Sequence, residues 1–163
     1  NSVTGEEKSL TDVLALAKEY NAAVIGLVQD EEGIPKSVDK RLEIAHKIVE
    51  RAAKAGIPAE DIVIDCLVLA IGADAGSGIA CLETIQRIRK ELGVNMTLAA
   101  SNISFGMPER TLLTGAFIVA TITAGATSII ADAAKIRPDV LAADLIAGRD
   151  QRARRYISGT RTA

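Results

Sequence analysis

Short apolar segments alternate with amphipathic segments along the whole chain. Segments of small and β-branched residues that are apolar on both faces predict strands at 22–28, within 61–70, at 96–101 and at 126–131. Segments with an apolar residue at every third or fourth position predict helices at 9–20, 38–55, 78–92, 108–124 and 137–149. This alternation is typical of βα units that build a parallel sheet.

Local signals predict where several helices begin and end. Ser9, with Asp12 three positions later, predicts a partial capping box at the start of the first helix. Pro108 suits the first turn of the fourth helix, because the N–H that proline lacks would have no helical partner there. Glycines predict the ends of two helices, the second at Gly56 and the fourth at Gly125.

The element count bears on the fold class. Residues 1–3, "NSV", are typical of the end of a strand, and the segment from about 150 to 163 is basic and is expected to be frayed. No linker separates the elements, so we predict one α/β domain over residues 1–163. A complete (β/α)₈ barrel needs about 250 residues. If the sheet belongs to such a barrel, the chain holds about its second half.

Composition and charge argue against several classes of partner. The net charge of −2 is mixed along the chain and gives no reason to expect a nucleic acid or a membrane. Aromatic residues make up 2% of the chain, too few to stack single-stranded bases. Two cysteines, Cys66 and Cys81, are too few for a disulfide scaffold and predict a reducing, cytoplasmic location.

Every expected strand ends in a carboxylate or an amide. Ligands of parallel α/β folds bind at the carboxyl ends of the strands, where these side chains would gather. Turn formation explains part of the pattern, because Asn and Asp are common turn residues. The mixture of acceptors and amide donors suits a flat heterocycle with N–H and C=O edges, such as a pterin. It suits phosphate poorly, because no Lys or Arg stands at a strand exit before Arg110. The exits are Asn1-Ser2, Gln29-Asp30, Asp65, Ser101-Asn102 and Asp132.

Other candidate chemistry in the sequence is weak. His46 lies within a helix beside Lys47 and is expected to be solvated, so no Ser-His-Asp set is formed. The two cysteines and one remote histidine lack the spacing of a metal site, and we expect no bound metal. The glycine-rich segment 72–78 is either a flexible loop or a loop that covers a ligand, and it lacks the dinucleotide and P-loop fingerprints.

Several stretches carry a resemblance to a known family. They are "NSVTGE" (1–6), "AAVIGLVQDEEGIP" (22–35), "DIVIDCLVLAIG" (61–72), "SNISFGMPERTLL" (101–113) and the closing "AADLIAGRDQRARRYI" (142–157). On these residues the chain resembles the pterin-binding methyltransferases. Within them it is similar to the methyltetrahydrofolate:corrinoid methyltransferases and to the folate domain of cobalamin-dependent methionine synthase. The resemblance implies a TIM (β/α)₈ barrel of the dihydropteroate synthase-like type, here its second half.

The resemblance also implies an activity and a site. The activity is methyl transfer between N5 of methyltetrahydrofolate and a corrinoid (cobalamin) cofactor on a partner protein. The implied pterin-binding residues are Asn1, Asp65, Asn102, Ser104 and Asp132. Asp65 would bind the amino-pyrimidine edge, and Asn102 would reach N5 as the catalytic residue. An amide fixed at N5 favours the protonated amine, a better leaving group. The cobalt supplies the nucleophile, so the protein needs none of its own.

Some features depart from the family, and alternatives stay open. Cys66 and Ala133 stand where the family usually has proline, and its first three strands have no counterpart here. A half-barrel has open sheet edges, so we expect self-association, as a homodimer. A non-catalytic half-barrel that binds or self-associates is one alternative, and a small doubly wound ligand-binding domain is another. A dihydropteroate synthase-like enzyme is a further one, although its Lys- and Arg-containing strand ends are not visible.

Overall fold

One parallel sheet forms the centre of the computed structural model, which describes residues 2–161. Each strand pairs with the strand that precedes it in the chain, so the order across the sheet is β1-β2-β3-β4. The strands are β1 (Ser2–Val3), β2 (Val24–Leu27), β3 (Ile62–Asp65) and β4 (Asn95–Thr97). The predicted α/β class is confirmed, and Asn1 lies outside the described residues.

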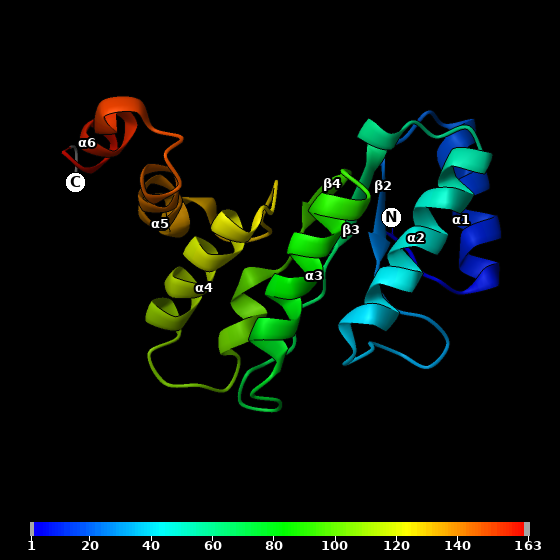
Figure 1. The fold of residues 1–163 in the computed structure, drawn as a ribbon, viewed down its shortest axis with the longest axis horizontal. Helices are drawn as coiled ribbons and strands as arrows, with labels where there is room; N and C mark the ends of the chain where they lie inside the picture. Colours follow the sequence, from blue (N-terminus) through cyan, green and yellow to red (C-terminus); the bar gives the residue numbers. More distant parts are fainter. Residues whose placement is uncertain (1, 162–163) are drawn as a thin grey trace.

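Helices follow the strands and cover one face of the sheet. The longer ones are α1 (Glu7–Glu19), α2 (Val38–Lys54), α3 (Ser77–Glu91), α4 (Arg110–Ala124) and α5 (Ala133–Ile146). Shorter elements are α6 (Arg154–Thr160) and the 3₁₀ turns η1 (Ala59–Asp61), η2 (Ala100–Ser104) and η3 (Gln151–Ala153). In Figure 1, α2 and α3 lie side by side in front of the sheet, and α5 and α6 lie at the end opposite α1.

The two faces of the sheet differ in burial. On the face toward the helices the side chains are buried, and the space above Gly26 is filled by Ile48 of α2 and by Ile64 of β3. On the opposite face, residues such as Ile25, Leu27 and Val63 are only half-buried. Parallel sheets are normally covered on both faces. This second face is therefore incompletely covered by the described chain.

The two later strand predictions are correct only in part. The predicted strand 96–101 ends at Thr97, and η2 follows it from Ala100. The predicted strand 126–131 runs beside β4 without forming a regular strand: the N–H groups of Ser128 and Ile130 donate to the carbonyls of Met96 and Leu98 (both 2.9 Å), and Ile130 bridges to Ala99. The Thr127 hydroxyl interrupts the ladder, because it accepts from the Met96 N–H (2.8 Å) in place of a backbone carbonyl.

Helix boundaries also differ from the prediction in places. The capping box predicted at Ser9 is wrong, since α1 begins at Glu7 and the Ser9 hydroxyl accepts from the Thr4 N–H at 3.0 Å. Pro108 lies outside α4, which begins after Glu109, a residue in the left-handed conformation. The basic segment expected to be frayed contains helix α6. The predicted helix ends at Gly56 and Gly125 are confirmed, and both glycines have positive φ.

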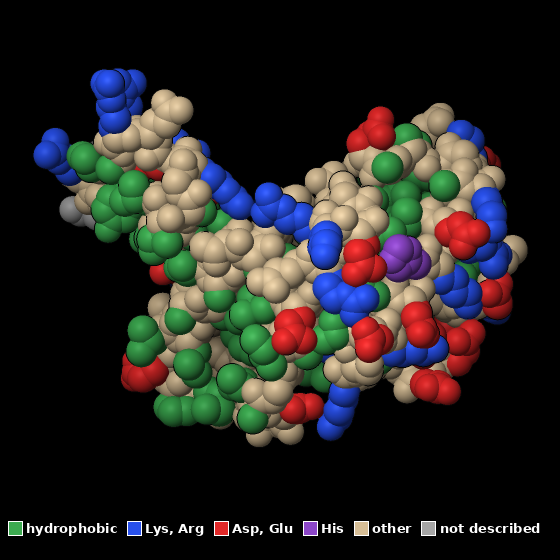
Figure 2. All heavy atoms as spheres, viewed as in Figure 1, with side chains coloured by type: hydrophobic (Ala, Val, Ile, Leu, Met, Phe, Trp, Pro, Cys, Tyr) green, Lys and Arg blue, Asp and Glu red, His purple; other side chains and the backbone are tan. Residues whose placement is uncertain are grey.

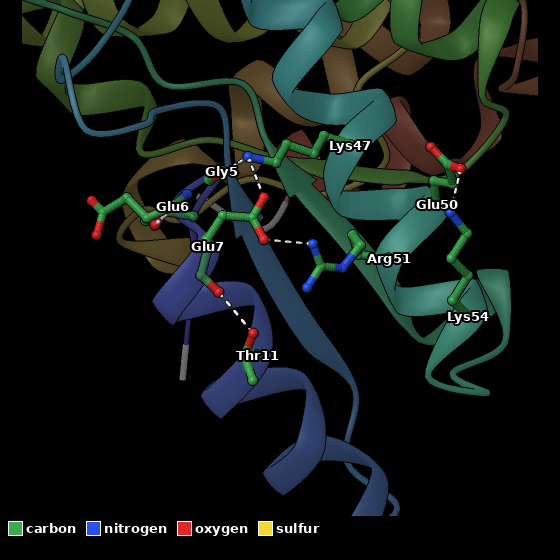
Figure 3. A network of polar contacts seen from close by, with 9 residues as sticks. Gly5, Glu6, Glu7, Thr11, Lys47, Glu50, Arg51 and Lys54 are labelled. Atoms are coloured by element: carbon green, nitrogen blue, oxygen red, sulfur yellow. Dashed lines mark hydrogen bonds and ion pairs between the residues drawn. The ribbon is translucent and has the colours of Figure 1, made fainter.

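A polar network joins α1 to α2 on the surface. In Figure 3 the Glu7 carboxylate lies between Lys47 (2.9 Å) and Arg51 (2.6 Å), and Lys47 also donates to the Gly5 carbonyl at 2.6 Å. The hydrogen bond from Arg51, and after it the one from Lys47, lowers the pKa of the Glu7 carboxylate. Figure 2 shows charged side chains gathered over these helices, whereas the region over α4, whose one charged residue is Arg110, carries few.

Replacing Gly125 with Ala is expected to lower the free energy of unfolding by about 2 kcal/mol. Gly125 has φ of +120°, and a Cβ there would lie 2.5 Å from Arg89 Cδ. Gly93→Ala is the matched control, because Gly93 also has positive φ (+64°) but an added Cβ would meet nothing within 4 Å. Urea denaturation should show a loss of only about 1 kcal/mol for this control. Equal losses would mean that Arg89 moves aside without a penalty.

Candidate functional site

The carboxyl ends of the strands meet at one edge of the sheet. Beyond the regular strands, the Gly5 N–H donates to the Gln29 carbonyl (2.8 Å), and the Cys66 N–H donates to the Thr97 carbonyl (3.0 Å). Asp65 stands level with Leu27 on one side and with Thr97 on the other. The exits of the described strands therefore lie on a common edge, as parallel pairing requires.

Asp65 ends β3 with its side chain almost removed from solvent. It is 7% exposed, and its Oδ1 accepts a hydrogen bond from the Leu67 N–H at 2.9 Å. Burial raises the pKa of Asp65, and the Leu67 hydrogen bond partly opposes this. Within residues 2–161 its Oδ2 has no hydrogen-bond partner, and no cation pairs with the carboxylate. Such an oxygen is suited to accept from the N–H groups of a ligand.

Asn102 lies in η2, at the turn that follows β4, and is exposed. The backbone of Asn102, not its side chain, takes part in this turn, since the Asn102 N–H donates to the Ala99 carbonyl (3.0 Å) and its carbonyl accepts from the Phe105 N–H (3.1 Å). The side-chain amide forms no hydrogen bond with any described residue. An asparagine that forms a turn usually does so through its side chain, and no described hydrogen bond of the Asn102 side chain supports that explanation.

Ser104 is fully buried behind the same turn. Its hydroxyl lies 2.9 Å from the Thr114 hydroxyl and 3.2 Å from the Ser101 carbonyl, and it accepts from Arg110 Nε at 3.3 Å. All of its hydrogen-bonding capacity is used within the protein. Direct contact with a ligand would require this network to open, and the sequence contained no sign of that burial.

Asp132 is exposed and begins α5 as its N-cap. Its Oδ1 accepts from the N–H groups of Ala134 (3.2 Å) and Lys135 (3.4 Å), and the Lys135 ammonium lies 3.3 Å from its Oδ2. The hydrogen bond from the Lys135 side chain is the main cause that lowers the pKa of Asp132. A cavity of about 300 Å³ brings Asp132 together with Ser101 and Arg110. Asn1, the remaining predicted site residue, lies outside the described residues.

The loops around this edge are tied to one another. The Ile71 N–H donates to the Ile103 carbonyl at 2.9 Å, which joins the loop after β3 to η2. In the glycine-rich segment, Asp74 accepts from the Gly76 N–H (3.0 Å) and pairs with Lys36 from the loop after β2 (3.4 Å). The segment 72–78 is therefore joined to the loop after β2 through Asp74, and the residue just before it is joined to η2.

Arg41 is a residue of this region that the sequence prediction missed. Although charged, it is 1% exposed, and its guanidinium contacts the carbonyls that follow β3. A signal was present in the sequence, because Arg41 stands four residues before Ala45 and seven before Ile48, on the apolar stripe of α2. A charge on such a stripe needs polar partners inside the protein.

The remaining candidate chemistry has a structural explanation. His46 is confirmed as a solvated helix residue, 3.3 Å from Glu91. Burial raises the pKa of Cys66 well above its usual range and that of Cys81 to about 12, so both thiols stay protonated at neutral pH. Within the described chain, no three His, Cys, Asp or Glu side chains cluster as a ligand set. None of the helices between residues 2 and 161 is long and apolar enough to cross a bilayer.

Comparison with known proteins places the chain among characterised relatives. Residues 1–132 match the family described as pterin binding enzyme. The chain is 29% identical over 166 residues to the methylcorrinoid:tetrahydrofolate methyltransferase of Eubacterium limosum, which covers 99% of the chain and 61% of that protein. It is 32% identical to the methionine synthase of Mycobacterium leprae and 34% identical to that of Mycobacterium tuberculosis, each over 142 residues. These matches cover 82% of the chain but only 12% of each synthase. The chain thus spans about three fifths of the first relative and about an eighth of the other two.

Proposed function

The chain belongs to the pterin-binding enzyme family, and from this premise we propose that it binds a reduced folate at the carboxyl ends of its strands. The reaction proposed is methyl transfer between N5 of tetrahydrofolate and a corrinoid carried by a partner protein. The relatives support this, since one is a methylcorrinoid:tetrahydrofolate methyltransferase and two are methionine synthases.

The Asp65 carboxylate is the observation that carries the proposal. It is nearly buried, it has no cation partner among the described residues, and the oxygen that accepts no hydrogen bond from them stays open to solvent, where a ligand can reach it. A carboxylate with so little solvent around it is stabilised when a donor completes that oxygen. The amino-pyrimidine edge of a pterin presents adjacent N–H groups, which are suitable donors for such a carboxylate.

Asn102 is assigned to N5 of the pterin as the catalytic residue. Its amide is neutral and exposed, and it forms no hydrogen bond within the described chain. An amide oxygen fixed beside N5 would accept a hydrogen bond from N5–H and so favour the protonated nitrogen, from which the methyl group departs to leave a neutral amine. The corrinoid cobalt of the partner protein would take up the methyl group as the nucleophile, or give it up in the reverse direction, and the chain's own residues bind and orient the folate.

The other predicted contacts take supporting places in this proposal. Ser104 holds the turn that presents Asn102, because its hydroxyl joins Ser101, Thr114 and Arg110. Asp132 borders the neighbouring cavity. For Asn1, we propose the pterin contact that the sequence predicts. The sheet itself is proposed as part of a TIM-barrel wall, since its strands follow in chain order and one face is half-covered. A homodimer and a cytoplasmic location remain predictions.

Tetrahydrofolate is expected to bind the protein with one site per chain in isothermal titration calorimetry. Because Asp65 is proposed to hold the pterin, 6-methyltetrahydropterin should also bind, whereas p-aminobenzoylglutamate, which lacks the pterin, should not. A chain that binds neither tetrahydrofolate nor the pterin fragment would support the non-catalytic alternative. Binding of p-aminobenzoylglutamate alone would place the site elsewhere.

A further inference from the structure

Arg41 is a buried cation without an anionic partner in the part of the chain that the structure describes. It lies in the first turns of α2 and is one of the largest fully buried side chains in the described protein. No carboxylate of residues 2–161 forms an ion pair with it. Burying a guanidinium costs several kcal/mol unless polar groups compensate it, so its partners define its role.

Backbone carbonyls of two loops are those partners. Arg41 Nη1 donates to the carbonyls of Cys66 (3.1 Å) and Leu67 (2.8 Å), directly after β3. Arg41 Nε donates to the carbonyl of Pro35 (2.7 Å), in the loop after β2. One planar side chain therefore ties together the exits of two neighbouring strands.

The sheet ladder ends where these contacts begin. The Asp65 carbonyl still accepts from the Val28 N–H at 3.4 Å, but the Gln29 N–H turns back to the Leu27 carbonyl at 2.8 Å. The carbonyls of Cys66 and Leu67 then accept from Arg41 rather than from a neighbouring strand. Leu67 has φ of +43°, a conformation that costs a leucine about 1 kcal/mol or more and that persists only when its surroundings hold it.

The same leucine positions the site carboxylate. Its carbonyl accepts from Arg41, and its N–H donates to Asp65 Oδ1 at 2.9 Å. The contacts thus run without interruption from Arg41 through Leu67 to Asp65. The pKa of Asp65 is shifted by burial and by the Leu67 N–H, and not by the charge of Arg41. Arg41 therefore acts on Asp65 through the backbone of Leu67 and not through a direct ion pair.

We propose that Arg41 is a positioning residue that holds Leu67 in its left-handed conformation, so that Asp65 is anchored by one oxygen and presents the other to the ligand. Because the guanidinium is occupied by carbonyls, it leaves that second oxygen free of a competing cation. The part of this inference that concerns ligand binding rests on the proposed folate site.

Arg41→Lys is the test variant, because lysine keeps the charge but lacks the fork that reaches Pro35, Cys66 and Leu67 together. Arg41→Gln, which keeps amide donors without charge, is the second variant in case the first folds poorly. Ile48→Val is the matched control, since Ile48 is fully buried on the same helix and packs over Gly26 rather than on the β3 exit.

The primary measurement needs no ligand. In the wild-type protein the NMR signal of the Leu67 amide proton should move with pH as Asp65 ionises, because the two are hydrogen-bonded. Arg41→Lys should lose most of the amplitude of this movement, and Ile48→Val should keep it. A full-amplitude movement in Arg41→Lys or Arg41→Gln would overturn the inference.

Calorimetry with tetrahydrofolate separates this inference from the proposed function. Arg41→Lys is expected to weaken binding about 10-fold, the effect of one misplaced hydrogen-bond acceptor. Ile48→Val should stay within about twofold of wild type, because it leaves that acceptor in place. If the amide signal behaves as expected but the wild-type protein binds no tetrahydrofolate, the proposed function fails and the Arg41 assignment stands. Equal affinity of Arg41→Lys and the control would refute the ligand-binding part.

Discussion

Asp65→Asn is expected to weaken tetrahydrofolate binding by about 100-fold, the effect of losing charge-assisted hydrogen bonds to two N–H donors. The new amide keeps an oxygen that can accept from the Leu67 N–H, and it places an NH₂ group where the ligand needs an acceptor. Calorimetry at neutral pH measures the loss. Asp12→Asn is the matched control, because Asp12 is exposed on α1 and the same change in charge occurs far from the strand exits.

The same substitution is expected to leave the protein at least as stable at neutral pH. Burial raises the pKa of Asp65 above that of an unfolded aspartate, so ionisation of this carboxylate destabilises the folded state. This destabilisation is absent below the unfolded pKa and is complete above the raised folded pKa. Urea denaturation across pH should therefore show Asp65→Asn gaining on wild type as pH rises through that window.

The affinity of the wild-type protein for tetrahydrofolate should increase with pH, whereas ionisation of Asp65 lowers its stability. Protonation of Asp65 removes an acceptor, so tetrahydrofolate affinity should fall as pH decreases through the raised pKa. Asp65→Asn should lack this dependence. A variant that binds tetrahydrofolate as tightly as wild type, or one with the same pH profile, would remove Asp65 from the site.

Asn102→Ala is expected to slow methyl transfer by about 10²–10³-fold, the usual effect of removing one hydrogen-bonding group fixed at a reacting atom. Tetrahydrofolate affinity should change by no more than about 10-fold, the worth of one hydrogen bond. The Asn102 side chain is exposed and forms no hydrogen bond with any described residue, so the truncation should not disturb the η2 turn. Single-turnover kinetics with a methylcorrinoid and calorimetry with tetrahydrofolate give the two quantities separately.

Asn95→Ala is the control for this variant. Asn95 begins β4 at the opposite end of the strand, where its side chain donates to the Glu60 carbonyl at 3.3 Å. Its replacement should leave the rate of methyl transfer unchanged. If Asn102→Ala loses affinity and rate in equal measure, Asn102 binds the folate but has no special part in the transition state.

The local elements of the fold were predictable from the chain itself. The apolar stripe of 38–55 and the glycines at 56 and 125 act within a few residues, and the structure has those helices and helix ends. One strand prediction failed where a side chain from another part of the chain competes with the backbone. The Thr127 hydroxyl accepts from the Met96 N–H, so 126–131 pairs with β4 at Ser128 and Ile130 without forming a regular strand.

The strand exits show the same division within the candidate site. The order of the residues is enough to predict that carboxylates and amides follow the strands, that the strands are parallel, and hence that these residues lie at one edge. Which of them have polar atoms without a partner among the described residues depends on how the distant parts of the chain pack together. One oxygen of Asp65 and the amide of Asn102 accept or donate no hydrogen bond within the described chain. The Ser104 hydroxyl, by contrast, is bonded to Thr114 and Arg110, and Arg41 reaches the carbonyls after β3 from the apolar stripe of α2. Side-chain hydrogen bonds between residues far apart in the chain make that distinction, and no local pattern records them.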